Sequence, residues 1–325
     1  MERIPHFLEA DLARVKALME ATLGSDIALL DATNRALQGR PGKMLRPMLA
    51  LLVAGAVGKK TEDTCRYAAA LELLHNATLL HDDVIDRAQS RRGLPTLYSL
   101  LGGGPAVLVG DYWLVACIRL ILSAEKHVQQ ALNLFSSTLG HLTEGELLQM
   151  DKAEKADTTQ EDYLRIVYGK TASLFELSAT MGALSAGAGE DVAARMGRFA
   201  CLLGTAFQIK DDIFDYSPLQ EAAIGKPVGI DLQERKITQP LLCALETVSP
   251  EEAAQVRAKV AGIAGSEVQE AQVRDFVLSH GGVELAAGVM DRYITDALAC
   301  LEDLPRTEEK EYLEKLACFV GDRKR

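Results

Sequence analysis

The sequence predicts an all-α fold, a single-domain helical bundle, from two observations. Apolar residues recur at intervals of three and four, as at Leu8, Leu12, Val15 and Met19, which is the period of one face of a helix and not the alternation of a strand. Turn-forming clusters separate these periodic runs into segments long enough for helices. No low-complexity tract, repeat of 20 to 50 residues or Pro/Ser-rich linker interrupts the chain, so one domain spanning residues 1–325 is the simplest organisation.

The helices are expected between successive turn signals. Glycine, proline and polar residues gather at residues 39–42, 55–60, 92–95, 102–105, 151–159, 187–189, 217–229, 249–250 and 281–282. The intervening segments are of a size to be helices, several of them longer than the average of about 11 to 12 residues.

Composition excludes several classes of protein. The 325 residues carry a net charge of −11, which disfavours nucleic acid as a partner because phosphate binding needs a surplus of Lys and Arg. The six scattered cysteines form no CxxC pair and are expected to be reduced, as in the cytoplasm. The N-terminus does not resemble a signal peptide. Asp111 and Arg119 interrupt the most apolar stretch, residues 105–122, so no membrane span is expected.

Two aspartate clusters share the spacing DDxxD. The first comprises Asp82, Asp83 and Asp86, and the second comprises Asp211, Asp212 and Asp215. On a helix the first and last members of each cluster project from one face, where like charges repel. A solvated acidic surface is the plain alternative for one such cluster, but two copies embedded in apolar helices favour a site that receives cations.

The donor atoms of these clusters suit a hard cation. Carboxylate oxygens without neighbouring cysteine ligands match Mg²⁺, which takes one or two carboxylates, waters and substrate phosphates. His81 adjoins the first cluster but is expected to pack or hydrogen-bond. The candidate metal ligands are Asp82, Asp86, Asp211, Asp212 and Asp215.

Cationic residues occur in turn-like or helix-end contexts around both clusters. They are Lys43, Arg46, Arg91, Arg92, Lys170, Lys226 and Lys236. Each alone would be read as a solvated surface charge, but together they suit an anionic substrate. The glycine-containing segment 225–231 follows a helix and not a strand, so a nucleotide cofactor is not indicated.

With these motifs the sequence resembles the trans-isoprenyl diphosphate synthases of the polyprenyl synthetase family. The similarity runs through GKMLRP, LLHNATLLHDDVIDRAQSRRG, GDYWL, EGELLQM, GKTASLFE, GTAFQIKDDIFDY and GKPVGIDLQERKITQPLL, over roughly residues 40 to 245. Met44 stands where the family often has a basic residue. The resemblance implies an all-α bundle around a deep central cavity, usually a homodimer, that condenses isopentenyl diphosphate head-to-tail onto an allylic diphosphate.

The resemblance also implies roles for individual residues. Asp82, Asp86 and Asp211 would bind about three Mg²⁺ ions on the allylic diphosphate, with Asp83 and Asp215 in support. Cations on that diphosphate would be Arg91, Lys170, Lys226 and Lys236, and isopentenyl diphosphate would be held by Lys43, Arg46, His75 and Arg92. Thr171 and Gln208 would stabilise the allylic cation with neutral dipoles, and the departing diphosphate would take the proton.

A medium or long product is implied by the resemblance, because short-chain members of the family tend to place an aromatic ring about one turn before the first cluster and this chain has small side chains there. The growing chain is expected to run along the helix on the N-terminal side of Asp82, where Ala77 and Thr78 are small, and Phe135 is a candidate for the floor. Octaprenyl diphosphate, made from farnesyl diphosphate, is the best expectation, and geranylgeranyl and hexaprenyl to decaprenyl products remain open. Because such a product is strongly apolar, transient membrane contact is expected during its release.

Two other functions stay open at this point. A class I terpene cyclase shares one DDxxD motif and the ionisation step, but normally has a different second metal motif. A non-catalytic subunit of a two-protein synthase would tend to lose aspartates, and all six are present here. A farnesyl or geranylgeranyl diphosphate synthase is an alternative within the same family.

Overall fold

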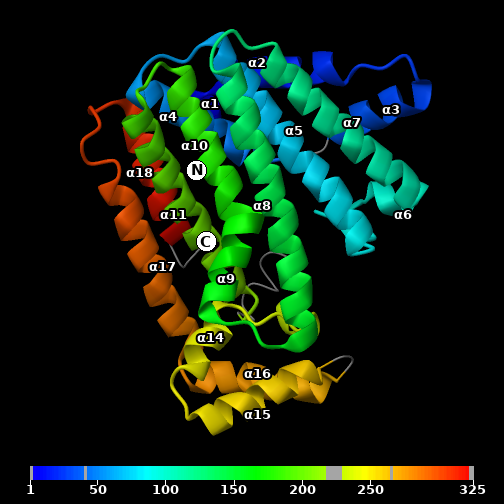
Figure 1. Cartoon of the computed structure of the whole chain (residues 1–325), viewed down its shortest axis with the longest axis vertical. Coiled ribbons are helices and arrows are strands. Elements are labelled where there is room, and N and C mark those ends of the chain that lie inside the picture. Colours follow the sequence, from blue (N-terminus) through cyan, green and yellow to red (C-terminus); the bar gives the residue numbers. More distant parts are fainter. Residues whose placement is uncertain (1–2, 40–41, 217–228, 264–265, 322–325) are drawn as a thin grey trace. The chain divides into compact units, whose positions relative to one another are not determined.

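The structure, a computed structural model, describes residues 3–39, 42–216, 229–263 and 266–321 (Figure 1). Nearly all regular structure in these ranges is helical. The two strands described, β1 (Ser90–Arg91) and β2 (Leu94–Pro95), pair antiparallel. The prediction of an all-α fold is confirmed.

The chain divides into two compact units. Unit 1 comprises Met1–Ser136, Leu177–Gly197 and Leu304–Leu313, and unit 2 comprises Ser137–Glu176, Arg198–Asp303 and Glu314–Arg325. One synthase domain over residues 1–325 stays a prediction.

Unit 1 is built on α5 (Glu62–Ile85), a helix of 24 residues. A capping box between Thr61 and Thr64 begins this helix. Glu62 and Asp63 in its first turn stabilise it further, because their negative charges lie at the positive end of the helix dipole. An alanine- and leucine-rich middle is buried in the core. The other helices wholly within this unit are α1 (Arg3–Phe7), α2 (Glu9–Leu23), α3 (Ala28–Gln38), α4 (Leu45–Val57), α6 (Leu97–Leu101) and α7 (Gly103–Leu122).

Unit 2 wholly contains α9 (Gln160–Val167), the π-helix η1 (Tyr168–Ala172), α13 (Ile230–Gln233), α14 (Gln239–Leu245), α15 (Pro250–Ala261), α16 (Glu267–Ser279) and α17 (Gly282–Ala299). Four helices contribute residues to both units: α8 (Val128–Lys155), α10 (Ser173–Ser185), α11 (Glu190–Phe214) and α18 (Glu308–Gly321).

Several turn predictions match the observed helix ends. Ser249 caps α15, which begins at Pro250, and Gly281 takes a positive φ of 65° before α17. The signal at residues 92–95 marks the β1–β2 hairpin, in which Arg92 and Gly93 have φ of 54° and 76°, as a type I′ turn requires. The turn predicted at residues 102–105 is wrong beyond Gly102: α7 begins at Gly103, because a proline is tolerated in the first turn of a helix.

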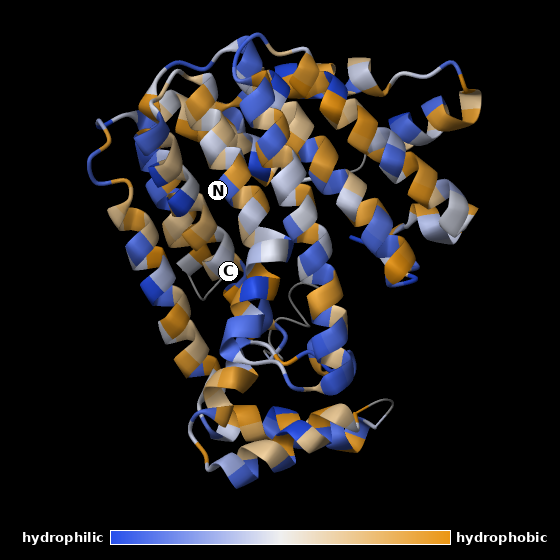
Figure 2. Cartoon of the chain, viewed as in Figure 1, coloured by the Kyte–Doolittle hydropathy of each residue, from blue (hydrophilic) through white to orange (hydrophobic). Residues whose placement is uncertain are grey.

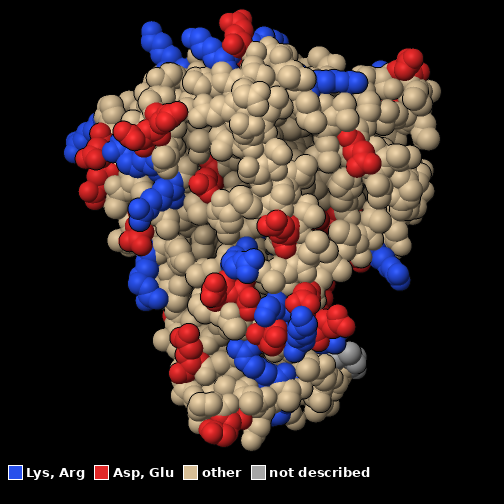
Figure 3. All heavy atoms as spheres, in the orientation of Figure 1, with Lys and Arg blue, Asp and Glu red and all other residues tan. Residues whose placement is uncertain are grey.

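Helix α7 is rich in apolar residues along its length (Figure 2), and several of their side chains are exposed. They include Val107, Leu108, Val115, Ile118 and Leu122. By length and composition α7 alone among the described helices could cross a membrane, with a mean hydropathy of 1.7 over a window that is 44% buried. Basic and acidic side chains are interspersed on the face drawn in Figure 3, so no field of one sign covers that face.

Candidate active site

Both DDxxD motifs lie at the C-terminal ends of long helices. Helix α5 ends at Ile85, one residue before Asp86, and α11 ends at Phe214, one residue before Asp215. Neither helix has a basic residue in its last turn. Carboxylates there repel one another and face the negative end of the helix dipole. Each helix end therefore concentrates unfavourable negative charge that a cation would relieve.

In the first motif, Asp83 differs from its neighbours. Asp82 is half-buried and Asp86 is exposed at the C-cap, whereas Asp83 is only 4% exposed and its Oδ1 accepts a 2.7 Å ion-pair hydrogen bond from Arg91 Nε. Arg91, predicted to neutralise the allylic diphosphate, is thus held by Asp83. The arrangement suits the supporting role predicted for Asp83 and leaves Asp82 and Asp86 on the more open face.

In the second motif, Asp212 is the buried member. It is 2% exposed; its Oδ2 accepts a hydrogen bond of 2.6 Å from the Tyr163 hydroxyl and its Oδ1 accepts one of 3.0 Å from Gln208 Nε2. Burial raises the pKa of Asp212, and these hydrogen bonds oppose the rise. Asp211 is exposed. Of the two, Asp211 is therefore the better placed for a metal ion, and Asp212, also predicted as a ligand, is engaged with protein donors.

Asp215 is hydrogen-bonded to the backbone at the start of α13 in unit 2. Its carboxylate accepts hydrogen bonds from the backbone N–H groups of Gly229, Ile230 and Asp231 at 3.1 to 3.2 Å. Burial raises the pKa of Asp215 against the effect of these donors. Asp231, a residue outside the predicted set, has its pKa raised by burial and then by Asp212 and Asp215. Unit 2 thus gathers more carboxylates than the second motif alone supplies.

The π-helix η1 carries two of the predicted residues, Lys170 and Thr171. A π-helix accommodates one extra residue per turn and occurs frequently at functional sites. The turn crosses α8 closely at Gly169, where a Cβ would lie 2.6 Å from the His141 carbonyl oxygen and 2.8 Å from Gly145 Cα. Glycine at both positions is therefore required for the backbones to approach.

Within unit 2 both side chains of this turn are already engaged. Lys170 Nζ lies 2.7 Å from Glu146 Oε2 and donates to Gln149 Oε1 at 3.0 Å. The Thr171 hydroxyl donates to Gln208 Oε1 at 2.9 Å. The predicted pair of neutral dipoles is thus brought together, and Glu146 and Gln149 hold the ammonium beside it.

A second cluster of cations lies in unit 1. Lys43 is exposed just before α4, while Arg46 on α4 has its pKa lowered to about 10 by burial, with Arg92 adding to the effect and Glu72 opposing it. Burial also lowers the pKa of His75 well below 6.5, and Arg46, Arg92 and Arg91 lower it further. The histidine is therefore neutral among positive charges, and an anion would be stabilised there.

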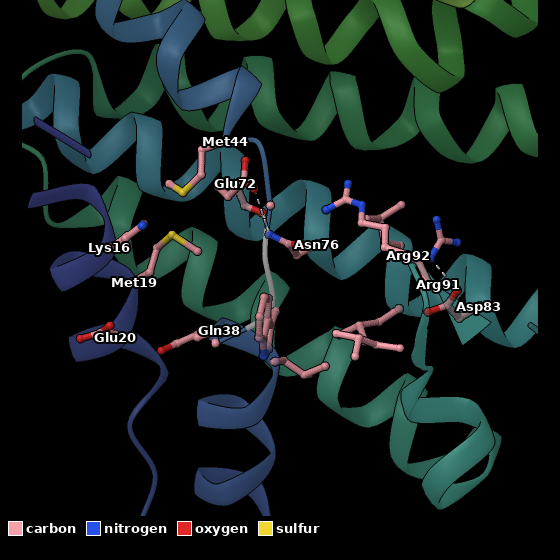
Figure 4. A pocket seen from close by; sticks show the side chains of 17 residues that line it. Lys16, Met19, Glu20, Gln38, Met44, Glu72, Asn76, Asp83, Arg91 and Arg92 are labelled. Carbon is pink, nitrogen blue, oxygen red and sulfur yellow. Dashed lines mark hydrogen bonds and ion pairs between the residues drawn. The ribbon is translucent and has the colours of Figure 1, made fainter. Parts of the chain in front are cut away.

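Beside this cluster a cavity of about 480 Å³ opens between α2, α5 and the β1–β2 hairpin (Figure 4). Arg91 and Arg92 line one side, and Lys16, Met19 and Glu20 of α2 line the opposite side (Figure 4). Its volume is in the range of small-molecule sites, roughly 300 to 1,000 Å³. The Gly42 backbone and the buried Glu72 also line it, so the cavity adjoins the residues predicted to hold isopentenyl diphosphate.

The residues predicted to gauge the product all belong to unit 1. Ala77 and Phe135 are buried, at 0% and 5% exposure, and Thr78 is half-buried with its hydroxyl donating to the His75 carbonyl oxygen at 2.8 Å. Thr78 precedes Asp82 by four residues and so shares its face of α5, whereas Ala77 precedes it by five and is turned away. Thr78 is the better candidate of the two on α5.

The remaining predicted residues are placed as follows. Lys236 pairs with Glu234 in unit 2, and Lys226 lies outside the described residues. Tyr163, Glu146, Gln149 and Glu72 were not predicted. Glu146 and Gln149 lie in the EGELLQM motif, so the sequence held a signal that could have identified them. Tyr163 and Glu72 are identified only by their contacts in the structure.

The donor set fits a divalent cation of the Mg²⁺ type. Each motif offers carboxylate oxygens that are at least partly accessible, Asp82 and Asp86 on α5 and Asp211 on α11. Among the described residues no three acidic, histidine or cysteine side chains converge into a closed cage. Mg²⁺ is characteristically bound through one or two carboxylates plus waters and substrate phosphates, so such open sites suit it.

The chain is similar to known proteins over its whole length. Residues 27–275 match the family model described as Polyprenyl synthetase. The octaprenyl diphosphate synthase of Escherichia coli is 34% identical over 325 residues, covering 100% of this chain and 99% of that protein. A decaprenyl diphosphate synthase from Rhodobacter capsulatus is similar in structure, with a TM-score of 0.91, 32% identity and coverage of 100% and 99% of the two chains.

A polyprenyl synthase from Caulobacter crescentus, complexed with calcium and isoprenyl diphosphate, has a TM-score of 0.88, 32% identity and coverage of 100% and 98%. The Escherichia coli and Rhodobacter capsulatus proteins are named for products of different length, octaprenyl and decaprenyl diphosphate. The full-length similarity, together with the two helix-end aspartate motifs, shows that the chain is a prenyltransferase and belongs to the polyprenyl synthetase family.

Proposed function

We propose that the protein is a medium- or long-chain trans-polyprenyl diphosphate synthase that adds isopentenyl diphosphate 1′-4 onto an allylic diphosphate. The observation that carries this proposal is the pair of DDxxD motifs at the C-terminal ends of α5 and α11, neither of which has a basic residue in its last turn. The protein resembles two prenyl diphosphate synthases over its whole length, with products named octaprenyl and decaprenyl.

Asp82, Asp86 and Asp211 are proposed to hold about three Mg²⁺ ions on the allylic diphosphate. Bound there, the cations would neutralise the charge that develops on the diphosphate as its C–O bond breaks. Asp83 and Asp215 support this arrangement from their hydrogen bonds with Arg91 and the backbone of residues 229–231. Lys170, Lys226 and Lys236 add fixed positive charge, Lys170 by exchanging Glu146 for a phosphate oxygen.

Isopentenyl diphosphate is proposed to bind among Lys43, Arg46, His75 and Arg92 without a metal ion. Burial and the neighbouring guanidinium groups lower the pKa of Arg46 and of His75, so this region disfavours further positive charge. A bound diphosphate would reverse that penalty, because opposite charges a few ångströms apart favour the ionised forms. Glu72, which is 6% exposed, balances only part of the charge.

The allylic cation is proposed to be stabilised by the Thr171 hydroxyl and the Gln208 amide. Both are neutral dipoles, so they lower the energy of a cation without forming a bond to it. The departing diphosphate is the proposed acceptor of the proton lost after coupling. The protein then needs no histidine as a general base.

The favoured product is octaprenyl diphosphate, with farnesyl diphosphate as the primer. The support is the small Thr78 on the Asp82 face of α5 and the similarity to the Escherichia coli enzyme. Geranylgeranyl diphosphate and other lengths remain alternatives, because relatives at similar identity make different products.

We further propose a cytoplasmic homodimer in which α7 meets its counterpart in a second copy. Exposed Val107, Leu108, Val115, Ile118 and Leu122 repeat at helical spacings along α7, and an apolar face of this kind is typical of a covered interface. Size-exclusion chromatography with light scattering tests this state; a dimer that V115E/I118E converts to a monomer is expected, and a monomeric wild-type chain would contradict it.

The experiment for the proposed function incubates purified protein with Mg²⁺, radiolabelled isopentenyl diphosphate and farnesyl diphosphate, and determines the chain length of the dephosphorylated products. A ladder ending in one long polyprenol is expected, and D82A should abolish it. Conversion of the allylic diphosphate alone would indicate a terpene cyclase. No incorporation with any allylic primer would overturn the proposal, and activity only on addition of a second protein would indicate a synthase subunit.

A further inference from the structure

Tyr163 is a buried residue of α9 with no role in the function proposed above. It is 4% exposed, and its hydroxyl donates to Asp212 Oδ2 at 2.6 Å. A phenol is protonated at neutral pH, so the hydroxyl is the donor of this contact. The contact is a short hydrogen bond to a carboxylate, which is stronger than one between neutral groups.

The carboxylate of Asp212 transmits this contact to Gln208. With Oδ2 taken by Tyr163, Oδ1 accepts from Gln208 Nε2 at 3.0 Å, one helical turn earlier on α11. The other atom of the amide, Oε1, accepts from the Thr171 hydroxyl at 2.9 Å. Three hydrogen bonds thus run in series from Tyr163 through Asp212 and Gln208 to Thr171, all within unit 2.

The series defines which way the Gln208 amide faces. An amide has one acceptor oxygen and one donor nitrogen, and exchanging them would set Oε1 against the Asp212 carboxylate, two acceptors with no proton between them. The amide dipole is therefore oriented with its negative end toward Thr171. This is the end that stabilises positive charge.

We infer that Tyr163 and Asp212 are positioning residues that orient the Gln208 amide for cation stabilisation. Neither needs to touch a substrate: Tyr163 secures the Asp212 carboxylate, which aligns the amide. The inference rests on the proposed function, since it assigns a consequence to the allylic cation. It predicts that Tyr163 acts on the chemical step only while residue 208 carries an amide.

A double-mutant cycle between Y163F and Q208L tests this dependence. Leucine retains most of the bulk of Gln208 without its dipole. The measurements are kcat and KM for each diphosphate with saturating Mg²⁺, together with the melting temperature of each variant. Y293F is the matched control, because Tyr293 is a half-buried tyrosine of unit 2 that lies outside this hydrogen-bond series.

Y163F is expected to lower kcat about tenfold, equivalent to ~1.4 kcal/mol in the activation barrier, with KM for both diphosphates changed less than about twofold. In the Q208L background the same substitution should change kcat less than about twofold, since residues acting through one group are not additive. Y293F should leave kcat unchanged.

Equal losses of kcat from Y163F in both backgrounds would overturn the inference, as would a loss confined to melting temperature. Should Y163F fail to fold, the cycle is run from Asp212 with D212N, for which the same two outcomes apply. An inactive wild-type protein would instead overturn the proposed function, so the two failures are distinguishable.

Discussion

Lys210 Nζ donates a 2.8 Å hydrogen bond to the carbonyl oxygen of Phe319, joining the residue before Asp211 to the last turn of α18. The ammonium lies 5.0 Å from the Phe319 ring centroid and 5.6 Å from that of Phe214, and the lysine is 6% exposed. The negative end of the α18 dipole stabilises a cation at this position, and the two aromatic rings replace part of the hydration of the ammonium.

K210M is expected to loosen the end of α18. Methionine fills similar space but leaves the part-buried carbonyl without this donor, a loss of roughly 1 to 3 kcal/mol in the free energy of unfolding. Urea unfolding measures the loss, and hydrogen exchange should speed up in residues 314–321. K259M, which changes an exposed lysine of α15, is the control; equal effects from the two variants would rule out a capping role.

G145A is expected to impair both stability and kcat. The added Cβ would lie 2.9 Å from Gly169 Cα, so α8 and the π-helix must separate, at a cost of roughly 1 to 3 kcal/mol. Their separation would displace Lys170 and Thr171. On the same helix a Cβ at Gly140 would meet no neighbouring element within 4 Å, so G140A should be neutral or slightly stabilising. Matching activities in the two variants would show that the close approach is not needed.

The stability of the protein is expected to fall on acidification through His75. In the folded state its pKa is depressed, whereas in the unfolded chain it is about 6.5. Below about pH 6.5 the unfolded chain therefore binds the extra proton, and unfolding is favoured as the pH falls. Between pH 7.5 and pH 5.5 the free energy of unfolding should fall more for wild type than for H75Q. A pH-independent difference would contradict a buried neutral histidine.

T78F is expected to shorten the product. Thr78 shares the Asp82 face of α5, and a phenyl ring one turn from that aspartate would block a chain growing along this face. The measurement is the chain length of polyprenols after dephosphorylation. T143F introduces the same side chain at an exposed threonine of α8 and should leave the product unchanged. An unaltered product from T78F would show that Thr78 does not limit the chain length, and Phe135 would be the next candidate.

The sequence was informative where a signal is local. Helical periodicity predicted the long helices, and the DDxxD spacing predicted aspartates at their ends. The change to a π-helix at Tyr168–Ala172 was not predictable, because a single extra residue in one turn does not alter the apolar pattern. Asp211 and Asp212 are identical in residue type, yet one is exposed and the other is 2% exposed beneath Tyr163. That distinction arises from packing between residues 49 positions apart.

The most direct test of the central claim measures single-turnover condensation of farnesyl diphosphate with isopentenyl diphosphate in D82N, D211N and the double variant. If the two helix ends act together on one diphosphate, each single substitution should slow the reaction by at least about 10²-fold, and the double variant should be little slower than either, as for residues that act as a unit. Retention of activity within about tenfold of wild type by either single variant would contradict the account.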